Sequence, residues 1–317
     1  MEVDMGTVHK LVDEHGKKDA ADQVRTRRPD RVVEAASASM LDDQMGEFST
    51  IIYSGWCHAG LPHRRTPSDA DWQIKTDHVT LVVEPGKLVK DDGSYEFVGV
   101  PYGANSRLIL YYLMDKALVT GNRNVELGKS LNAFLDRLGL SQGGKTNKSV
   151  REQIERISRC KLTFHLQRGN LRGVSNQAIV ESAAFFESEK DDERQQSLFT
   201  DTLRLSEGFY QQLQRHAVRL DERAIRKIHN NSRALDVYSW LAFRLHHLKE
   251  ATFIPWAALR PQFAAGIKWA SNFTPVMRDD LLLALSVYEQ AKVDIAERGI
   301  TLHPSAPPVP DRLRLIR

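Results

Sequence analysis

Apolar residues recur with helical spacing in several segments of the chain, and shorter apolar or alternating runs lie between these segments. From residue 105 to residue 188 the pattern predicts a helix, a short strand, a helix, a turn, a helix, a strand, a loop and a strand. The third helix is expected over 146–160, where Val150, Ile154 and Ile157 form one apolar stripe. A helix-turn-helix followed by a β-hairpin is the order of a winged helix.

The second half of the chain repeats this order of elements without repeating the residues. A long helix is expected over 232–248, a short strand over 251–255 and a short helix over 256–264. A longer helix over 272–290 and a hairpin over 292–304 follow. We therefore predict an α+β protein that carries two winged-helix (helix-turn-helix plus β-hairpin wing) domains in tandem.

The length of 317 residues suits two domains of about 150 residues each. The first 46 residues are polar and have no sustained apolar period, so we expect a mobile arm there, with at most a short helix at 32–43. Further strands are expected over 78–85, 95–101 and 198–205, and a solvated acidic loop over 188–196. The expected segments are a flexible polar arm (1–46), a first winged-helix domain (47–204), a second winged-helix domain (205–305) and a Pro-rich basic tail (306–317).

Composition narrows the class of protein only slightly. Hydrophobic residues make up 41% of the chain, which is enough for real cores, and the net charge is only +3. Cys57 and Cys160 lie far apart, so we expect neither a disulfide framework nor a four-ligand zinc site. The N-terminus lacks a signal-peptide core, and no apolar run approaches the roughly 20 residues of a membrane span. We expect a cytoplasmic bacterial protein with no membrane partner.

Positive charge is concentrated in one window, residues 144–173, which contains only Glu152 and Glu155 as acids. A recognition helix places its first residues against base edges, and the flanking basic residues neutralise phosphates. The expected DNA-binding residues are Lys145, Thr146, Asn147, Lys148 and Arg151 at the helix start, with Arg168 and Arg172 in the wing loop. The other basic residues of the window are Arg156, Arg159 and Lys161. The alternative is an ordinary solvated amphipathic helix.

The second module carries a weaker signal at the start of the helix 272–290. We expect Lys268, Asn272 and Arg278 to contact DNA there, although Asp279 and Asp280 weaken the prediction. A second basic group is spread over several elements, and a phosphate-binding surface and a solvated face are equally consistent with it. Its members are Arg215, Arg219, Arg223, Arg226, Lys227, Arg233 and Arg244.

Signals for catalysis are weak, and we expect no catalytic site, no metal and no cofactor. A metal-dependent DNA-nicking site would need two histidines that flank one hydrophobic residue, whereas His246 and His247 are adjacent and are expected to point to different sides of a helix. The chain has no phosphate-binding loop of the GxxxxGK[ST] type. Cys57, His58 and His63 have a loose metal-ligand spacing, for which a structural loop is the favoured interpretation.

Two long runs carry a resemblance to a known family. The runs GVPYGANSRLILYYLMDKAL and ELGKSLNAFLDRLGLSQGGKTNKSVREQIERISRCKLTF resemble the plasmid-encoded RepA replication protein family, and so do IIYSGWCHAGLPHR and LVVEPGKL. The run SRALDVYSWLAFRL resembles the first helix of the second winged-helix module in iteron-binding initiators. The likeness covers roughly residues 48–305.

This resemblance implies a function. Such proteins bind repeated sites of double-stranded DNA at a plasmid origin, help to open the duplex and recruit the host initiator and replicative helicase. Some related initiators repress their own gene as dimers, so a monomer and a homodimer both stay open. The alternative function is a tandem winged-helix transcriptional repressor, or copy-number autoregulator, without a direct role in replication. Direct repeats beside an AT-rich tract would favour the initiator, and a single palindrome over the promoter would favour the repressor.

Overall fold

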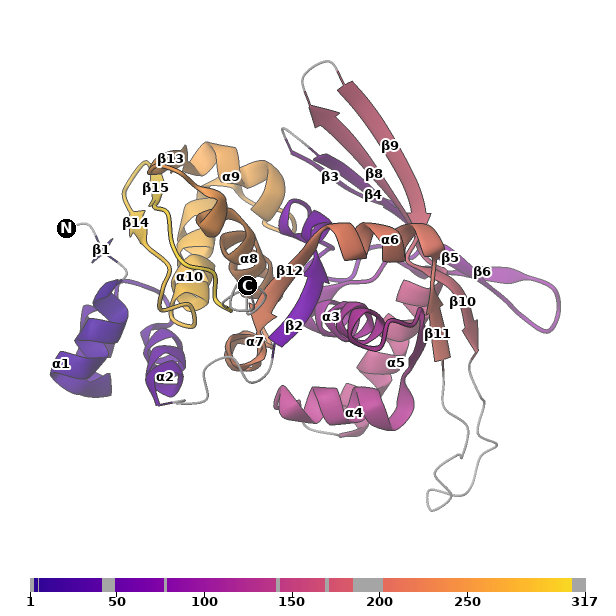
Figure 1. Ribbon diagram of the computed structural model, residues 1–317, viewed down its shortest axis with the longest axis horizontal. Helices are drawn as coiled ribbons and strands as arrows, with labels where there is room; N and C mark the ends of the chain where they lie inside the picture. Colours follow the sequence, from indigo (N-terminus) through magenta and orange to yellow (C-terminus); the bar gives the residue numbers. More distant parts are fainter. Residues whose placement is uncertain are drawn as a thin grey trace, which may run out of the picture. The chain divides into compact units, whose positions relative to one another are not determined.

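The computed structural model describes residues 3–4, 6–41, 49–76, 79–140, 143–168, 171–184 and 202–309. The chain forms two units (Figure 1). Residues 64–217 make up one, which we call the inserted unit, and residues 1–63 and 218–317 make up the other, which we call the split unit. The fold class is mixed α+β, as expected, but these boundaries differ from the expected ones at 46/47 and 204/205.

The inserted unit is built around the helix α3 (Gly103–Thr120), in which every residue from Ser106 to Met114 is buried. The predicted order of elements is confirmed: α3 is followed by the strand β7 (Asn124–Glu126), the helices α4 (Gly128–Arg137) and α5 (Gly144–Arg159), and the strands β8 (Lys161–Arg168) and β9 (Leu171–Ala178). The helix α6 (Glu207–Arg215) completes the unit.

Three antiparallel sheets accompany these helices. The largest has the order β3-β4-β8-β9, and its strands lie side by side in Figure 1. Its first two strands are β3 (Trp72–Lys75) and β4 (Val79–Glu84). A three-stranded sheet has the order β10-β11-β7, and β5 pairs with β6. The remaining strands are β5 (Gly86–Val89), β6 (Tyr95–Gly99), β10 (Val180–Ala184) and β11 (Thr202–Leu205).

The hairpin after α5 is longer than the sequence pattern indicates. The predicted loop over 167–173 is mostly strand, because β8 and β9 pair from Lys161↔Ala178 to Arg168↔Leu171. The predicted single strand over 175–188 is divided between β9 and β10. The expected acidic loop at 188–196 lies outside the described residues.

The split unit has the helix α8 (Ser232–Arg244) at its centre, with Leu235, Tyr238 and Leu241 fully buried. Its main sheet has the order β1-β14-β15-β13. The other elements are β1 (Val3–Asp4), β2 (Ser49–Tyr53), η1 (Ser54–Cys57), β12 (Ala217–Asp221), α7 (Glu222–Ile228), η2 (Leu245–His247), β13 (Thr252–Pro255), α9 (Trp256–Phe263), η3 (Ala270–Asn272), α10 (Phe273–Leu285), β14 (Val293–Ile295) and β15 (Gly299–Leu302). The helix expected over 272–290 therefore ends five residues early.

The N-terminal segment differs from the expected mobile arm. It forms the helices α1 (Gly6–Gln23) and α2 (Pro29–Met40), and β1 pairs with β14. On α2, Val32, Val33, Ala35 and Ala36 are buried. These small apolar residues form too narrow a stripe to stand out in a polar composition, yet they suffice for packing.

Polar contacts also hold this segment on α10. The Arg27 Nε donates to Asp279 Oδ2 at 2.5 Å, and the Thr26 hydroxyl donates to Asp279 Oδ1 at 2.6 Å. A guanidinium of Arg31 donates to the side-chain oxygen of Asn230. At the other end of the chain, the expected Pro-rich basic tail is described only to residue 309, and the Tyr288 hydroxyl donates to the carbonyl of Ala306. No helix of the described ranges is both long and apolar enough to cross a bilayer.

A buried arginine joins α5 to the segment that precedes α3. The side chain of Arg156 is 2% exposed. Its guanidinium donates to Glu152 Oε1 at 2.8 Å and to the carbonyl of Val100 at 3.0 Å. Gly99, with φ +81°, lies against this guanidinium, and a Cβ there would collide with it. A buried guanidinium is tolerated only when its donors are satisfied, so the segment and the helix fix each other.

We expect Arg156→Ala to destabilise the inserted unit by about 2–4 kcal/mol, because it removes buried hydrogen bonds and leaves a cavity. Urea unfolding of the full chain measures this change. The matched control is Arg151→Ala, which alters an exposed arginine of the same helix and should leave the midpoint unchanged. Equal midpoints for the two variants would contradict a structural role for Arg156.

Candidate DNA-binding surfaces

The first candidate surface is the exposed face of α5. Lys145, Asn147, Lys148 and Arg151 are exposed there, and Thr146 is half-buried. The helix turns its predicted apolar stripe inward, with Val150, Ile154 and Ile157 all buried. Five of the predicted site residues therefore lie together at the first two turns of one helix.

The orientation of α5 is fixed by polar contacts from the opposite side. The backbone N–H of Tyr102 donates to the side-chain oxygen of the buried Gln153 at 2.8 Å. The side-chain amide of Asn105 donates to the Ser149 hydroxyl at 3.0 Å. These contacts come from residues at the start of α3, so the exposed face stands on a rigid base.

The structure separates the basic window into structural and exposed charges. Arg156 is buried, as described above, and Arg159 is half-buried with its Nε 3.5 Å from Glu155 Oε1. Lys161 is exposed at the first position of β8. Arg168 ends β8 and Arg172 lies near the start of β9, in backbone register with Gln167. The side chains of Arg168 and Arg172 lie outside the described part of the structure.

The acids of α5 do not offset this charge, because each has a basic partner. Glu152 Oε1 accepts from Arg156 and lies 4.0 Å from the Arg65 guanidinium. Glu155 faces Arg159. The first two turns themselves contain no acid, so the face presents uncompensated positive charge together with one amide. Such a face suits phosphate neutralisation and the reading of base edges.

The second candidate surface is the start of α10. Lys268, Ser271 and Asn272 are exposed, and Thr274 is half-buried. Arg278 is half-buried, and its guanidinium donates to the carbonyl of Ala296 at 3.3 Å, so this predicted DNA-binding residue braces the β14–β15 hairpin.

The two aspartates that weakened this prediction are both engaged within the split unit. Asp279 accepts from Arg27 and Thr26. Asp280 accepts from Arg233 at 3.1 Å and from the side-chain amide of Asn231 at 2.7 Å. The second surface is thus less acidic than the sequence indicates, but it exposes fewer cations than α5.

The basic group that is spread over several elements also divides into structural and exposed charges. Arg223 pairs with Asp221 at 2.6 Å, and Arg233 donates to carbonyl oxygens as well as to Asp280. Arg219 and Arg226 are exposed. Sequence reasoning counted Arg156, Arg223 and Arg233 as surface charge. For Arg156 a signal existed, because positions 153, 156, 157 and 160 share one helix face, which the apolar stripe predicts to be buried.

The predicted placement of His246 and His247 on different sides of a helix is wrong. Their ring centroids lie 3.9 Å apart, because the two residues occupy the 3-10 turn η2 rather than the helix. The Nδ1 of His246 lies 2.7 Å from the carbonyl of Ala242, and that of His247 lies 2.6 Å from the carbonyl of Phe243. Both contacts use the backbone of the preceding helix turn.

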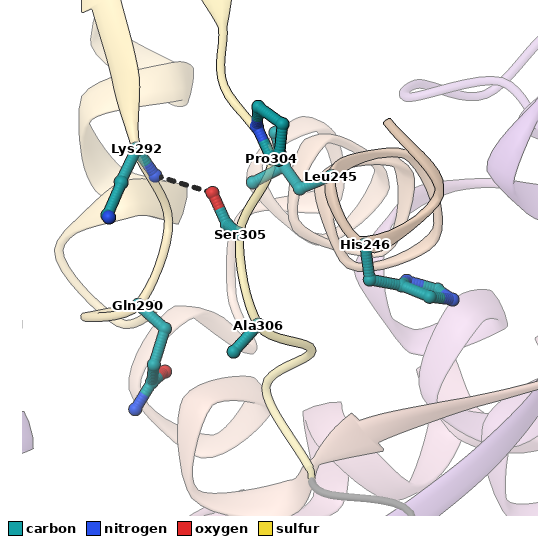
Figure 2. A pocket seen from close by; sticks show the side chains of 7 residues that line it. All are labelled: Leu245, His246, Gln290, Lys292, Pro304, Ser305 and Ala306. Carbon is teal, nitrogen blue, oxygen red and sulfur yellow. Dashed lines mark hydrogen bonds between the residues drawn. The ribbon is translucent and has the colours of Figure 1, made fainter. Parts of the chain in front are cut away.

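A cavity of about 500 Å³ lies beside this turn (Figure 2). It is lined by Leu245, His246, Gln290, Lys292, Pro304, Ser305 and Ala306. Figure 2 shows the ring of His246 directed away from Ser305. The Ser305 hydroxyl accepts from the backbone N–H of Lys292 at 3.0 Å and donates to the carbonyl of His303. The lining therefore offers few convergent polar groups for a ligand.

The loose trio of Cys57, His58 and His63 has structural surroundings. Cys57 is fully buried, the ring of His58 meets Phe243 edge-on at 4.9 Å, and His63 Nδ1 lies 3.0 Å from the Ser232 hydroxyl. Within the described ranges, no group of three or more His, Cys, Asp or Glu residues is arranged to hold a metal ion. Burial raises the pKa of Cys57 far above its usual range, with a further contribution from Asp236, and burial raises the pKa of Cys160 to about 12.

We expect neither cysteine of the native protein to react with iodoacetamide at neutral pH, because the thiolate is the nucleophile and both thiols stay protonated and buried. Mass spectrometry after timed labelling measures this. The same chain unfolded in urea is the control and should label at both positions. Rapid labelling of either native cysteine would contradict the buried environment.

Part of the chain matches a known protein family. Residues 100–257, about half of the chain, match the family described as plasmid encoded RepA protein. The matched segment contains α3, α4, α5 and α8. The chain belongs to this family, which supports a general role as a plasmid replication initiator.

Two solved structures resemble the fold. The chain is similar to domains 2 and 3 of RctB in a selenomethionine crystal structure, with a TM-score of 0.52, 13% identity, and coverage of 79% of this chain and 98% of the other. A second RctB structure, of domains 2-3, aligns with a TM-score of 0.46 and 13% identity over 78% of this chain and 94% of the other. At this identity the likeness concerns the fold alone. No curated protein sequence matches the chain.

Proposed function

We propose that this protein is a plasmid replication initiator that binds repeated sites in double-stranded DNA at its plasmid origin. The single observation that carries the proposal is the exposed face of α5, with Lys145, Lys148 and Arg151 around Asn147 and no acid in the first two turns. This face lies inside the segment that matches the RepA family. Sequence-independent affinity would come from the cations, and base readout from Asn147 and Arg151.

Each unit would act as one winged-helix module. In the inserted unit the order α3-β7-α4-α5-β8-β9 matches helix, strand, helix, recognition helix and wing. In the split unit the order α8-β13-α9-α10-β14-β15 matches it again. The proposed recognition helices are therefore α5 and α10. Two modules on one chain suit a site longer than one helical turn of DNA.

Origin opening and recruitment of the host initiator and helicase complete the proposal, which follows the family for these steps. It includes no catalytic residue, cofactor or metal, and it places the protein in the cytoplasm. The same surfaces would also serve a repressor without a replication role, or an initiator that represses its own gene as a homodimer. Footprinting on the DNA beside the gene separates these functions. Protection of direct repeats beside an AT-rich tract supports the initiator, and protection of one promoter palindrome alone refutes it.

We expect binding to duplex DNA to weaken on the order of a thousandfold between about 50 and about 200 mM salt, if about six phosphates are contacted. Fluorescence anisotropy on the footprinted site and on a scrambled duplex measures this. Lys148→Ala should weaken binding to both DNAs alike and lower the salt slope by about one. Asn147→Ala and Arg151→Ala should weaken the footprinted site selectively, by about 1–3 kcal/mol each.

Lys116→Ala, which changes a residue of α3 outside the proposed surface, is the control for this series and should leave affinity unchanged. A flat salt response would contradict the docking surface. Equal losses on both DNAs for Asn147→Ala and Arg151→Ala would mean that α5 positions the protein without reading bases.

We also expect no nicking of supercoiled origin DNA, with or without a divalent metal, because the chain lacks two histidines that flank one hydrophobic residue. Agarose gels of the plasmid after incubation with purified protein test this, with a commercial nicking enzyme as the positive control. Relaxation that disappears when a tyrosine is replaced by phenylalanine would contradict it.

A further inference from the structure

The most exposed tryptophan of the chain lies between α9 and α10, directly before η3. The residue Trp269 is 61% exposed, whereas Trp56, Trp240 and Trp256 are buried and Trp72 is half-buried. A tryptophan carries a large apolar surface, and folding alone favours burying it. An exposed tryptophan beside a candidate recognition helix is therefore a candidate contact residue.

The backbone around Trp269 is ordered by local turns. Gly266 adopts φ +76° in the turn after α9, and the N–H of Ile267 donates to the carbonyl of Ala264 at 2.9 Å. The carbonyl of Trp269 accepts from the N–H of Asn272 at 3.0 Å, which closes η3. Trp269 thus has a defined place in the α9–α10 turn.

Arg233 of α8 holds this turn by hydrogen bonds to its backbone. Arg233 donates to the carbonyls of Phe263 and Ala265, at 3.0 and 3.1 Å, and pairs with Asp280 on α10 at 3.1 Å. Asn231 donates to the second oxygen of that carboxylate. The clamp joins α8, the turn and α10, so Trp269 is presented by a rigid platform. Little conformational entropy is then lost when the side chain makes a contact.

The immediate neighbours of Trp269 suit a nucleic acid. The Lys268 ammonium lies 5.2 Å from the centroid of the indole ring. Ser271 and Asn272, both exposed, follow at the start of α10. A cation for a phosphate, an apolar ring and two hydrogen-bonding side chains therefore lie within the five positions 268–272. Apolar contacts with thymine methyl groups and polar contacts with base edges occur together in major-groove recognition.

We propose that Trp269 and Lys268 form a DNA-contacting element of the split unit, in which the indole ring packs on apolar atoms of duplex DNA while Lys268 neutralises a neighbouring phosphate. The apolar atoms are thymine methyl groups or deoxyribose carbons at the edge of the groove that receives α10. This inference rests on the proposed function and adds to it a second reading element, whose contact is an aromatic ring rather than a cluster of cations.

Tryptophan fluorescence of the full chain gives a direct readout, because Trp269 is the most exposed of the five tryptophans. The probe is an alternating dA–dT duplex at low salt. We expect the duplex to change the emission and to protect it from acrylamide quenching. Trp269→Phe should remove both responses while the protein still binds.

Affinity for the same duplex is the second readout. We expect Trp269→Ala to weaken binding about five- to tenfold and Trp269→Phe to restore most of the loss, because phenylalanine keeps an apolar ring. The matched control is Phe253→Ala, which removes an exposed aromatic side chain of β13 in the same unit and should leave affinity unchanged. Replacing dT by dU in the duplex removes the methyl groups. If the wild-type protein then loses affinity and Trp269→Ala does not, the ring contacts thymine methyls. If the wild-type protein binds the two duplexes equally, the ring contacts deoxyribose.

Two outcomes would overturn the inference. If the duplex leaves the fluorescence of the wild-type protein unchanged and the Trp269 variants keep wild-type affinity, while Lys148→Ala still weakens binding, the Trp269 contact is refuted and the proposed function stands. A response to single-stranded dT without a response to the duplex would refute the duplex contact. Failure of the wild-type protein to bind duplex DNA at any salt concentration would instead refute the proposed function itself.

Discussion

The buried guanidinium of Arg156 is the constraint on which the inserted unit depends. An arginine without access to water must place its donors on protein acceptors, and here these acceptors are Glu152 and the carbonyl of Val100. The helix α5 can therefore take only one rotation about its axis, with Val150 and Ile154 inside and Asn147 outside. This ion pair also neutralises Glu152, which is the acid of α5 that lies closest to the exposed face. Interior packing and the positive character of the surface thus have one cause.

In the split unit, a different ion pair fixes one helix against another. Arg233 and Asp280 join α8 to α10, and the arginine also holds the turn between α9 and α10 through two carbonyls. In each unit a basic residue, Arg156 or Arg233, therefore connects elements inside the fold and is not a surface charge. Each pair neutralises an acid that lies near a candidate surface, so the local charge of that surface is more positive than its sequence indicates.

Periodicity predicted the helices well where the apolar stripe is strong. The stripe of Val150, Ile154 and Ile157 indicated α5 to within two residues at its start. Periodicity could not indicate the docking of α1 and α2, because the partner of Arg27 is Asp279, 252 positions away. It also misplaced His246 and His247, because a 3-10 turn ends α8 and no local residue signals the change. The exposed face of α5 was predictable from charge and spacing, whereas the roles of Arg156 and Arg233 required the folded partners.

The split unit has a consequence for synthesis of the chain on the ribosome. The helices α1 and α2 emerge long before α10 and β14, which contact the N-terminal segment that carries these helices. At a synthesis rate of about 5–20 residues per second, roughly 10 to 50 s pass between the synthesis of α2 and that of its packing partners. The inserted unit is contiguous and can fold during this interval. A nascent or truncated chain can therefore carry a complete α5 surface while its N-terminal helices remain undocked, so the two candidate surfaces are completed at different times during synthesis.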